Sequence, residues 1–203
     1  EIIDLMANKQ FIVANYKLLD ASEYLDELLD HSDEDTDLIE IAISYVDGGI
    51  ASEHLFNMQV GDKFNAMGPA GRLVLKNGEK LRKLILVGTG TGIAPYRAML
   101  PTIEQVLAVD VAEVHVLLGV QYKADAIYAE DFRQYADKIE SLYFKVCLSR
   151  EQEALAPDEQ KGYVQHVFDQ LDLNPEEDVV YLCGNPNMID DAFALLTDSG
   201  FDA

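Results

Sequence analysis

The 203-residue sequence predicts a C-terminal α/β domain with a parallel sheet in residues 80–203, preceded by an antiparallel β-barrel domain in residues 1–79. After residue 80, short β-rich apolar runs alternate with helical patterns. Before it, short strand candidates are separated by glycine-containing turns. A third observation is a glycine-rich segment that stands directly between the first buried run of the second part and its first helix.

In the second part we expect four strands, at 83–87, 114–118, 142–148 and 179–183. Helices are expected between and after them, at 95–109, 129–135, 164–171 and 186–199. Strands that alternate with helices at this spacing form right-handed βαβ units, and such units build a parallel sheet.

The first part has a different pattern. Strand candidates lie at 38–43, 63–67 and 72–75, and glycine turns separate them, which suits an antiparallel barrel or sandwich. An amphipathic helix is expected at 22–30 and a short helix at 53–58. Ser52 precedes this second helix, so its hydroxyl is either an ordinary N-cap or a phosphate ligand.

Composition narrows the class of protein. With 15 Lys+Arg against 37 Asp+Glu, the formal net charge is −22, which argues against nucleic acid or an anionic membrane as partner. No apolar run approaches the ~20 residues of a membrane span, and the acidic start does not resemble a signal peptide. Two cysteines form no disulfide framework, so we expect a cytoplasmic protein. The histidines are scattered along the chain and suggest no metal site.

The strongest motif is Gly-Thr-Gly-Thr-Gly-Ile-Ala-Pro, between a buried strand and a helix, where a phosphate can meet free N–H groups. It comprises Gly88, Thr89, Gly90, Thr91, Gly92 and Pro95. The glycines permit close approach of a pyrophosphate, the threonines add hydroxyl donors, and the proline suits a first helical turn. The spacing is neither G-x-G-x-x-G nor that of a P-loop.

This segment resembles the pyridine-nucleotide pyrophosphate loop of the ferredoxin–NADP(+) reductase superfamily. Further motifs follow in that family's order: G-x-x-S-x-x-L at 49–55, G-P-x-G at 68–71, Ser-Arg-Glu at 149–151, and Tyr-Leu-Cys-Gly-Asn-Pro-Asn-Met at 181–188. Together they span about residues 38–201. The resemblance implies a flavin barrel followed by an NAD(P)-binding α/β domain.

The resemblance assigns roles on the nucleotide side. It places Ser149 and Arg150 at the 2′-phosphate of NADP, with Lys161 and Tyr163 completing the pocket, so NADP is favoured over NAD. The alternative is a surface Arg, a surface Lys and a packed Tyr. Cys183 would lie beside the nicotinamide and position its ring, whereas Cys147 is expected to be a small buried hydrophobe. Further cofactor-binding candidates near that cysteine are Gly184, Asn185 and Met188.

On the flavin side the resemblance implies FAD contacts by Gly49 and Ser52, and by the turn that contains Gly68, Pro69 and Gly71. The family's R-x-Y-S motif is absent, and the nearest segment, at 14–19, keeps only Tyr16. Residues before 38 leave too little room for the early strands of a six-stranded barrel, so we expect an incomplete barrel, in either a fragment of a longer chain or a chain that has lost segments.

Two functions remain open at this stage. The first is an oxidoreductase that transfers a hydride from NAD(P)H to FAD and passes electrons to a redox protein or small acceptor. The second is a non-catalytic, flavin-less nucleotide-binding module or a subunit of an electron-transfer complex. The missing R-x-Y-S motif favours the second, and the glycine-rich segment with Cys183 favours the first.

Overall fold

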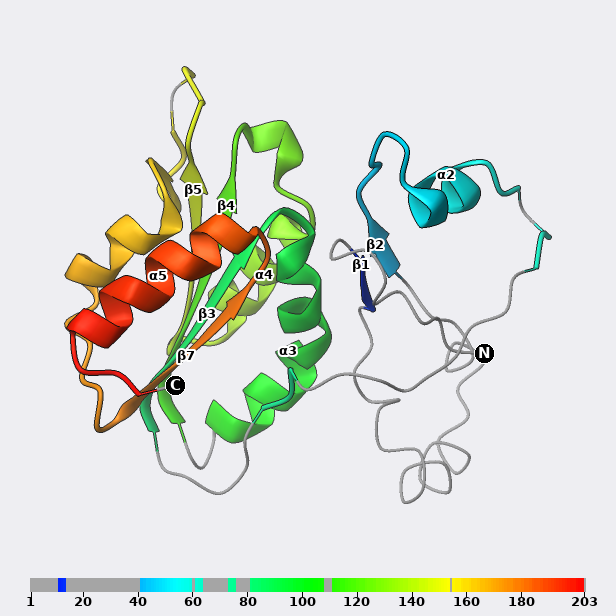
Figure 1. Ribbon diagram of the computed structural model, residues 1–203. Helices are drawn as coiled ribbons and strands as arrows, with labels where there is room; N and C mark the ends of the chain where they lie inside the picture. Colours follow the sequence, from blue (N-terminus) through cyan, green and yellow to red (C-terminus); the bar gives the residue numbers. More distant parts are fainter. Residues whose placement is uncertain are drawn as a thin grey trace.

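A computed structural model describes residues 11–13, 41–59, 61–63, 73–75, 81–107, 111–153 and 155–202. Its main feature is a five-stranded sheet with the strand order β6-β5-β4-β3-β7, in which all neighbouring strands run parallel (Figure 1). The strands are β3 (Leu81–Thr89), β4 (Val111–Val120), β5 (Leu142–Leu148), β6 (Glu159–Lys161) and β7 (Asp178–Cys183). The parallel α/β domain that the sequence predicts is thereby confirmed.

Helices cover both faces of this sheet. Helices α3 (Ala94–Leu107) and α4 (Ala129–Lys138) pack on one face, and the 3₁₀ helix η4 (Val164–Gln170) and α5 (Pro186–Asp198) pack on the other (Figure 1). Alternate residues of β3 enter the two cores, since Leu84 and Leu86 face α3 and α4 while Ile85 and Val87 face α5. Both faces of β3 are therefore buried, which explains its continuous apolar run.

The four expected strands of the parallel sheet are confirmed, and β6 is the strand of this sheet that the sequence did not indicate. Its three residues, Glu-Gln-Lys, form the edge of the sheet and carry no apolar pattern. The expected helices at 95–109, 129–135 and 186–199 correspond to α3, α4 and α5. The expected helix at 164–171 is a 3₁₀ helix, and α3 tolerates Pro101 in its interior.

Before residue 80 the structure describes an antiparallel pair, β1 (Phe11–Val13) with β2 (Ile41–Ile43), and the helix α2 (Ile50–Phe56). Ala42 of β2 is buried together with Ala94 of α3, and Ile127 and Tyr128 pack against them. A barrel is not seen in the described part of the chain, and residues 73–75, expected within a strand, are irregular. The expected helix at 22–30 and most of the expected strand at 63–67 lie outside the described residues.

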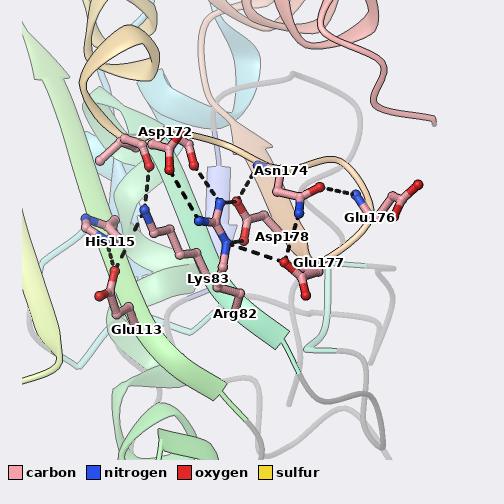
Figure 2. A network of polar contacts seen from close by, with 10 residues as sticks. Arg82, Lys83, Glu113, His115, Asp172, Asn174, Glu176, Glu177 and Asp178 are labelled. Carbon is pink, nitrogen blue, oxygen red and sulfur yellow. Dashed lines mark hydrogen bonds and ion pairs between the residues drawn. The ribbon is translucent and has the colours of Figure 1, made fainter.

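A polar network joins the amino ends of β3, β4 and β7 (Figure 2). At its centre the buried carboxylate of Asp178 accepts hydrogen bonds from Arg82, at 3.0 Å from Nε and 2.6 Å from Nη2. The backbone amide of Asn174 donates to the same carboxylate at 2.7 Å. On β4, His115 lies 3.1 Å from Glu113, whose carboxylate is also 3.9 Å from Lys83. This network fixes the edge of the sheet opposite to the glycine-rich segment.

Candidate functional site

The order of the strands defines where a ligand-binding crevice is expected at the carboxyl edge of the sheet. The chain leaves β3 toward β4 on one side, whereas β7 pairs with the other side of β3. This reversal is a topological switch point, the place where open parallel sheets bind ligands. Gly88 and Cys183 face each other in register across it. The glycine-rich segment and the cysteine predicted from the sequence thus come together at this point.

Beyond β3 the chain forms a 3₁₀ turn, η2 (Gly90–Ile93), which leads directly into α3. Gly90 adopts φ +54°, and a Cβ built on it would meet no atom within 4 Å. Pro95 is buried in the first turn of α3, where a missing N–H costs nothing. A strand, a left-handed glycine and a helix start therefore follow one another as an anion-binding turn requires.

Two of the three glycines are also required for packing within the protein. A Cβ on Gly92 would lie 2.3 Å from the carbonyl oxygen of Cys183, and one on Gly88 would lie 2.9 Å from that of Gly92. Gly184 has φ +133°, and its Cβ would lie 2.2 Å from Thr89 Oγ1. These glycines allow two backbone segments to pack directly on each other, whereas Gly90, in the same turn, borders open space.

Thr89 joins the two segments with a hydrogen bond. Its Oγ1 accepts the backbone N–H of Asn185 at 2.8 Å, so this hydroxyl oxygen is already used within the protein. Asn185 is in turn the N-cap of α5, and its Oδ1 accepts the N–H of Asn187 at 2.9 Å. The turn after β7 is consequently held by β3 on one side and by its own helix on the other.

Cys183 ends β7, partly buried against the core beneath α3 and α4. Burial raises the pKa of its thiol to about 11, so the sulfur is protonated at neutral pH. Burial also raises the pKa of Cys147, to about 12, and this side chain lies in the opposite core, fully buried as expected. Met188, expected among the cofactor ligands, is 7% exposed and lies in that same core, so its side chain packs instead.

Ser149 and Arg150 follow β5, and Lys161 and Tyr163 lie at and beyond the end of β6. Leu148 and Lys161 are partners in the parallel register, and Gly162 donates to the carbonyl of Leu148 at 3.0 Å. The four candidates are therefore brought to one end of neighbouring strands. Tyr163 is 59% exposed, and Lys161 and Arg150 are exposed as well.

Arg150 differs from the other described arginines in its surroundings. Each of the others pairs with an aspartate: Arg82 with Asp178, Arg97 with Asp131, and Arg133 with Asp158. Arg150 has no ion pair with a described carboxylate, although the chain carries 37 Asp+Glu. An unpaired guanidinium at a ligand-binding edge is suited to a phosphate.

The structure adds Gln165 to the candidates on this edge. The sequence places it in the Lys-Gly-Tyr-Val-Gln segment, but residue type alone gave it no role. Its Oε1 is buried and has no hydrogen-bond partner among the described residues. A buried amide oxygen is normally satisfied, so this acceptor suits a polar ligand group.

On the amino-terminal side, Ser52 is 1% exposed and lies inside α2, whose N-cap is Gly49. Its Oγ accepts the N–H of Val46 at 3.1 Å and lies 3.0 Å from the carbonyl of Val46 and 3.1 Å from that of Gly49. Of the two alternatives for Ser52, the N-cap is wrong, because the helix begins earlier and Gly49 is its N-cap. The Ser52 hydroxyl instead braces the preceding turn, and its role as a phosphate ligand stays a prediction. The remaining flavin-side candidates, Tyr16, Gly68, Pro69 and Gly71, lie outside the described residues.

Within the described ranges, no helix has the length and apolar character that crossing a membrane demands. The same part of the chain contains no group of three or more His, Cys, Asp or Glu residues arranged to hold a metal ion.

A parallel α/β sheet with a glycine-rich turn at its switch point defines a nucleotide-binding domain. The family model for the oxidoreductase NAD-binding domain matches residues 86–193, more than half of the chain. The chain belongs to this family, and with it to the ferredoxin–NADP(+) reductase-like superfamily that its motifs resemble.

Known proteins similar to this chain agree with that placement. The toluate 1,2-dioxygenase electron transfer component of Pseudomonas putida is 31% identical over 75% of this chain and 44% of its own length. Ferredoxin–NADP reductase B of Sorangium cellulosum is 28% identical over 74% of this chain and 62% of its own. The chain thus spans only part of these relatives.

Among solved structures, a ferredoxin NADP+ reductase from Neisseria gonorrhoeae, with bound FAD and NADP, matches with a TM-score of 0.65. Its sequence is 24% identical, and the match covers 80% of this chain and 67% of the other. At this identity the likeness establishes the fold alone.

Proposed function

We propose that the chain is the nucleotide-binding part of an FAD-dependent reductase that takes a hydride from NADPH. The observation that carries this proposal is the register of β3 with β7, which sets Gly88 opposite Cys183 at the switch point. A pyrophosphate turn and a small neutral side chain then flank the same crevice, one for each end of a dinucleotide. The names of the relatives, an electron transfer component and a ferredoxin–NADP reductase, support the same class of reaction.

In this proposal the pyrophosphate lies on η2 and on the start of α3. Gly90 lets the pyrophosphate approach the backbone closely, since open space borders its α-carbon and its backbone is left-handed. The start of α3 adds the positive end of its helix dipole. Thr91 is half-buried at this turn and completes the set of donors.

The adenosine end would then extend over β5 and β6. Arg150 and Lys161 supply two cations for the 2′-phosphate, and the exposed ring of Tyr163 can stack on a base. The unsatisfied Oε1 of Gln165 lies on the same segment and can accept a hydrogen bond from an exocyclic amine. Because the phosphate distinguishes NADPH from NADH, these cations favour NADPH.

The nicotinamide end would lie beside Cys183. The protonated thiol is small and uncharged, so it can border the ring without adding to it as a nucleophile. The backbones of Gly92 and Cys183 pack directly on each other, and we call this contact the glycine interlock. It fixes the distance between the Cys183 side chain and the pyrophosphate turn. The position of the nicotinamide ring matters here, because a displacement of about 1 Å can lower the rate of a reaction as much as ~10²-fold.

Bound FAD would supply the two-electron acceptor for this hydride and release electrons to a redox protein or small acceptor. The described residues that would support it are those of the Gly49–Ser52 turn and α2. The second candidate function, a flavin-less nucleotide-binding module, is favoured by one specific observation, the absence of the R-x-Y-S motif.

An absorption spectrum and rapid kinetics test the proposal together. The purified protein, reconstituted with FAD where needed, is expected to show flavin bands near ~450 nm that NADPH bleaches. Cys183→Ala should slow this bleaching about tenfold or more while the dissociation constant for NADP+ stays within about twofold. A protein that binds NADP+ but retains no FAD would favour the flavin-less module. Failure to bind either nucleotide would contradict both functions.

A further inference from the structure

Glu151 is one of the few buried charged residues of the described chain, at 8% exposure, and it follows Arg150 directly. A buried carboxylate needs partners that replace water. Its neighbour in sequence is the obvious cation, yet Arg150 forms no ion pair with a described carboxylate. The structure satisfies Glu151 in another way.

The carboxylate of Glu151 accepts three backbone amides. Its Oε1 accepts the N–H of Gln152 at 2.8 Å and that of Glu153 at 3.0 Å, both from its own loop. Its Oε2 accepts the N–H of Lys123 at 3.2 Å, from the loop after β4. The amides of Glu153 and Lys123 are the main causes that lower the pKa of Glu151, which is therefore ionised at neutral pH.

The backbone before Glu151 is attached to the same neighbouring loop. Ser149 N–H donates to the carbonyl of Val120, and Arg150 N–H donates to that of Gln121, each at 3.0 Å. Hydrogen bonding between the two chain segments thus continues beyond the ends of β4 and β5. The contact between Glu151 and the Lys123 amide follows as the next link between the two loops. The Arg150 backbone is held on both sides, while its side chain stays exposed.

We propose that Glu151 is the positioning residue of the 2′-phosphate pocket. By holding amides from two loops it fixes the Ser149–Arg150 turn, and because those amides take up its charge, the Arg150 guanidinium remains available to the phosphate. This inference rests on the proposed role of Arg150 in NADPH binding.

The test compares Glu151→Gln with Glu153→Gln in the full chain, by calorimetric titration with NADP+ and with NAD+. Both variants remove one negative charge near Arg150, but Glu153 is exposed and its side chain holds no loop. In Glu151→Gln, an NH₂ group replaces one of the two accepting oxygens, so either the contact with the Lys123 amide or the two contacts within its own loop are lost. We expect NADP+ to bind about tenfold more weakly to Glu151→Gln, with NAD+ within about twofold, and Glu153→Gln to match or exceed the wild type.

A second pair of variants leaves the Arg150 loop untouched. Lys123→Pro removes the amide that reaches Glu151, at the first position of the 3₁₀ helix η3 (Lys123–Asp125), where proline is tolerated. Lys123→Ala keeps that amide and removes the side chain, including its ion pair to Glu159. Lys123→Pro should therefore weaken NADP+ more than Lys123→Ala does, with NAD+ affected equally by both.

Arg150→Ala, measured in parallel, distinguishes a failure of the role of Glu151 from a failure of the phosphate role of Arg150. Selective loss of NADP+ affinity in Arg150→Ala, with wild-type NADP+ affinity in Glu151→Gln and Lys123→Pro, would overturn the role of Glu151 and leave the phosphate site intact. If Arg150→Ala weakens NADP+ and NAD+ alike, or neither of them, the phosphate assignment is wrong and the role of Glu151 is overturned with it.

Discussion

At the amino edge of the sheet, Arg82 and Lys83 contact the carboxylates of Asp178 and Glu113 (Figure 2). At the carboxyl edge, Arg150 and Lys161 have no ion pair with a described carboxylate, although acidic residues outnumber basic ones by 37 to 15. The strands are the same, so the difference lies in the loops at their two ends. Paired charges stabilise the first edge, and unpaired cations leave the second free to bind an anion.

This comparison predicts that changes at the amino edge alter stability and not nucleotide affinity. Changes in side chains at the carboxyl edge should do the reverse. The glycine interlock is the exception, because it belongs to the carboxyl edge yet joins two buried backbone segments.

The largest effect is expected for Gly92→Ala, whose Cβ would lie 2.3 Å from the Cys183 carbonyl oxygen. Backbone cannot yield as a flexible side chain does, so the free energy of unfolding should fall by about 3 kcal/mol, as urea denaturation would measure. NADP+ affinity should fall as well, because the two loops separate.

Gly90→Asn is the matched control for this variant. Asparagine tolerates left-handed φ, and no atom lies within 4 Å of the new Cβ, so stability should change by less than about 1 kcal/mol. Its side chain enters the open space beside the turn, and NADP+ affinity should fall about tenfold. Equal loss of stability in both variants would contradict the separate roles assigned to these glycines.

Asp178→Asn is expected to have the next largest effect, a melting temperature lower by roughly 5 °C. The buried carboxylate would lose charge-assisted hydrogen bonds from Arg82 and the amide of Asn174. Asp172→Asn removes a carboxylate that is 97% exposed and 3.6 Å from the same arginine, so its melting temperature should stay near that of the wild type. NADP+ affinity should match the wild type in both variants. A loss of NADP+ affinity in Asp178→Asn would contradict the separate roles of the two edges.

A smaller effect concerns pH. Burial lowers the pKa of His115, which also faces Glu113, Lys83 and Asp178 and stacks on Tyr143. Below about pH 6.5 the unfolded chain gains a proton that the folded chain takes up only at lower pH. The stability that neutral His115 contributes is therefore present above that pH and is lost as the pH falls.

The measurement is the melting temperature at pH 7 and at pH 5.5. Between these values His115→Gln should lose roughly 1–2 °C less than the wild type. His166→Gln changes an exposed histidine and should follow the wild type. An unchanged pH dependence in His115→Gln would assign the acid sensitivity to other groups.

Much of the α/β part could be predicted from the sequence, because its apolar runs are buried on both faces and its helices follow an amphipathic period. The strand β6 could not, since an edge strand of Glu-Gln-Lys has no burial pattern. The approach of Gly92 to Cys183 joins residues far apart in sequence, so only the structure reveals that two motif glycines serve packing. Glu151 was visible only as part of a motif, because its backbone partners carry no sequence signal.

Amide hydrogen exchange with and without NADP+ tests the central claim most directly. We expect protection in the segments 88–95, 149–153, 161–165 and 183–187, all at the carboxyl edge, and no change at 171–178 or at the start of β3. Protection centred on the amino edge, or none at a saturating NADP+ concentration, would contradict the assignment of the carboxyl edge as the nucleotide site.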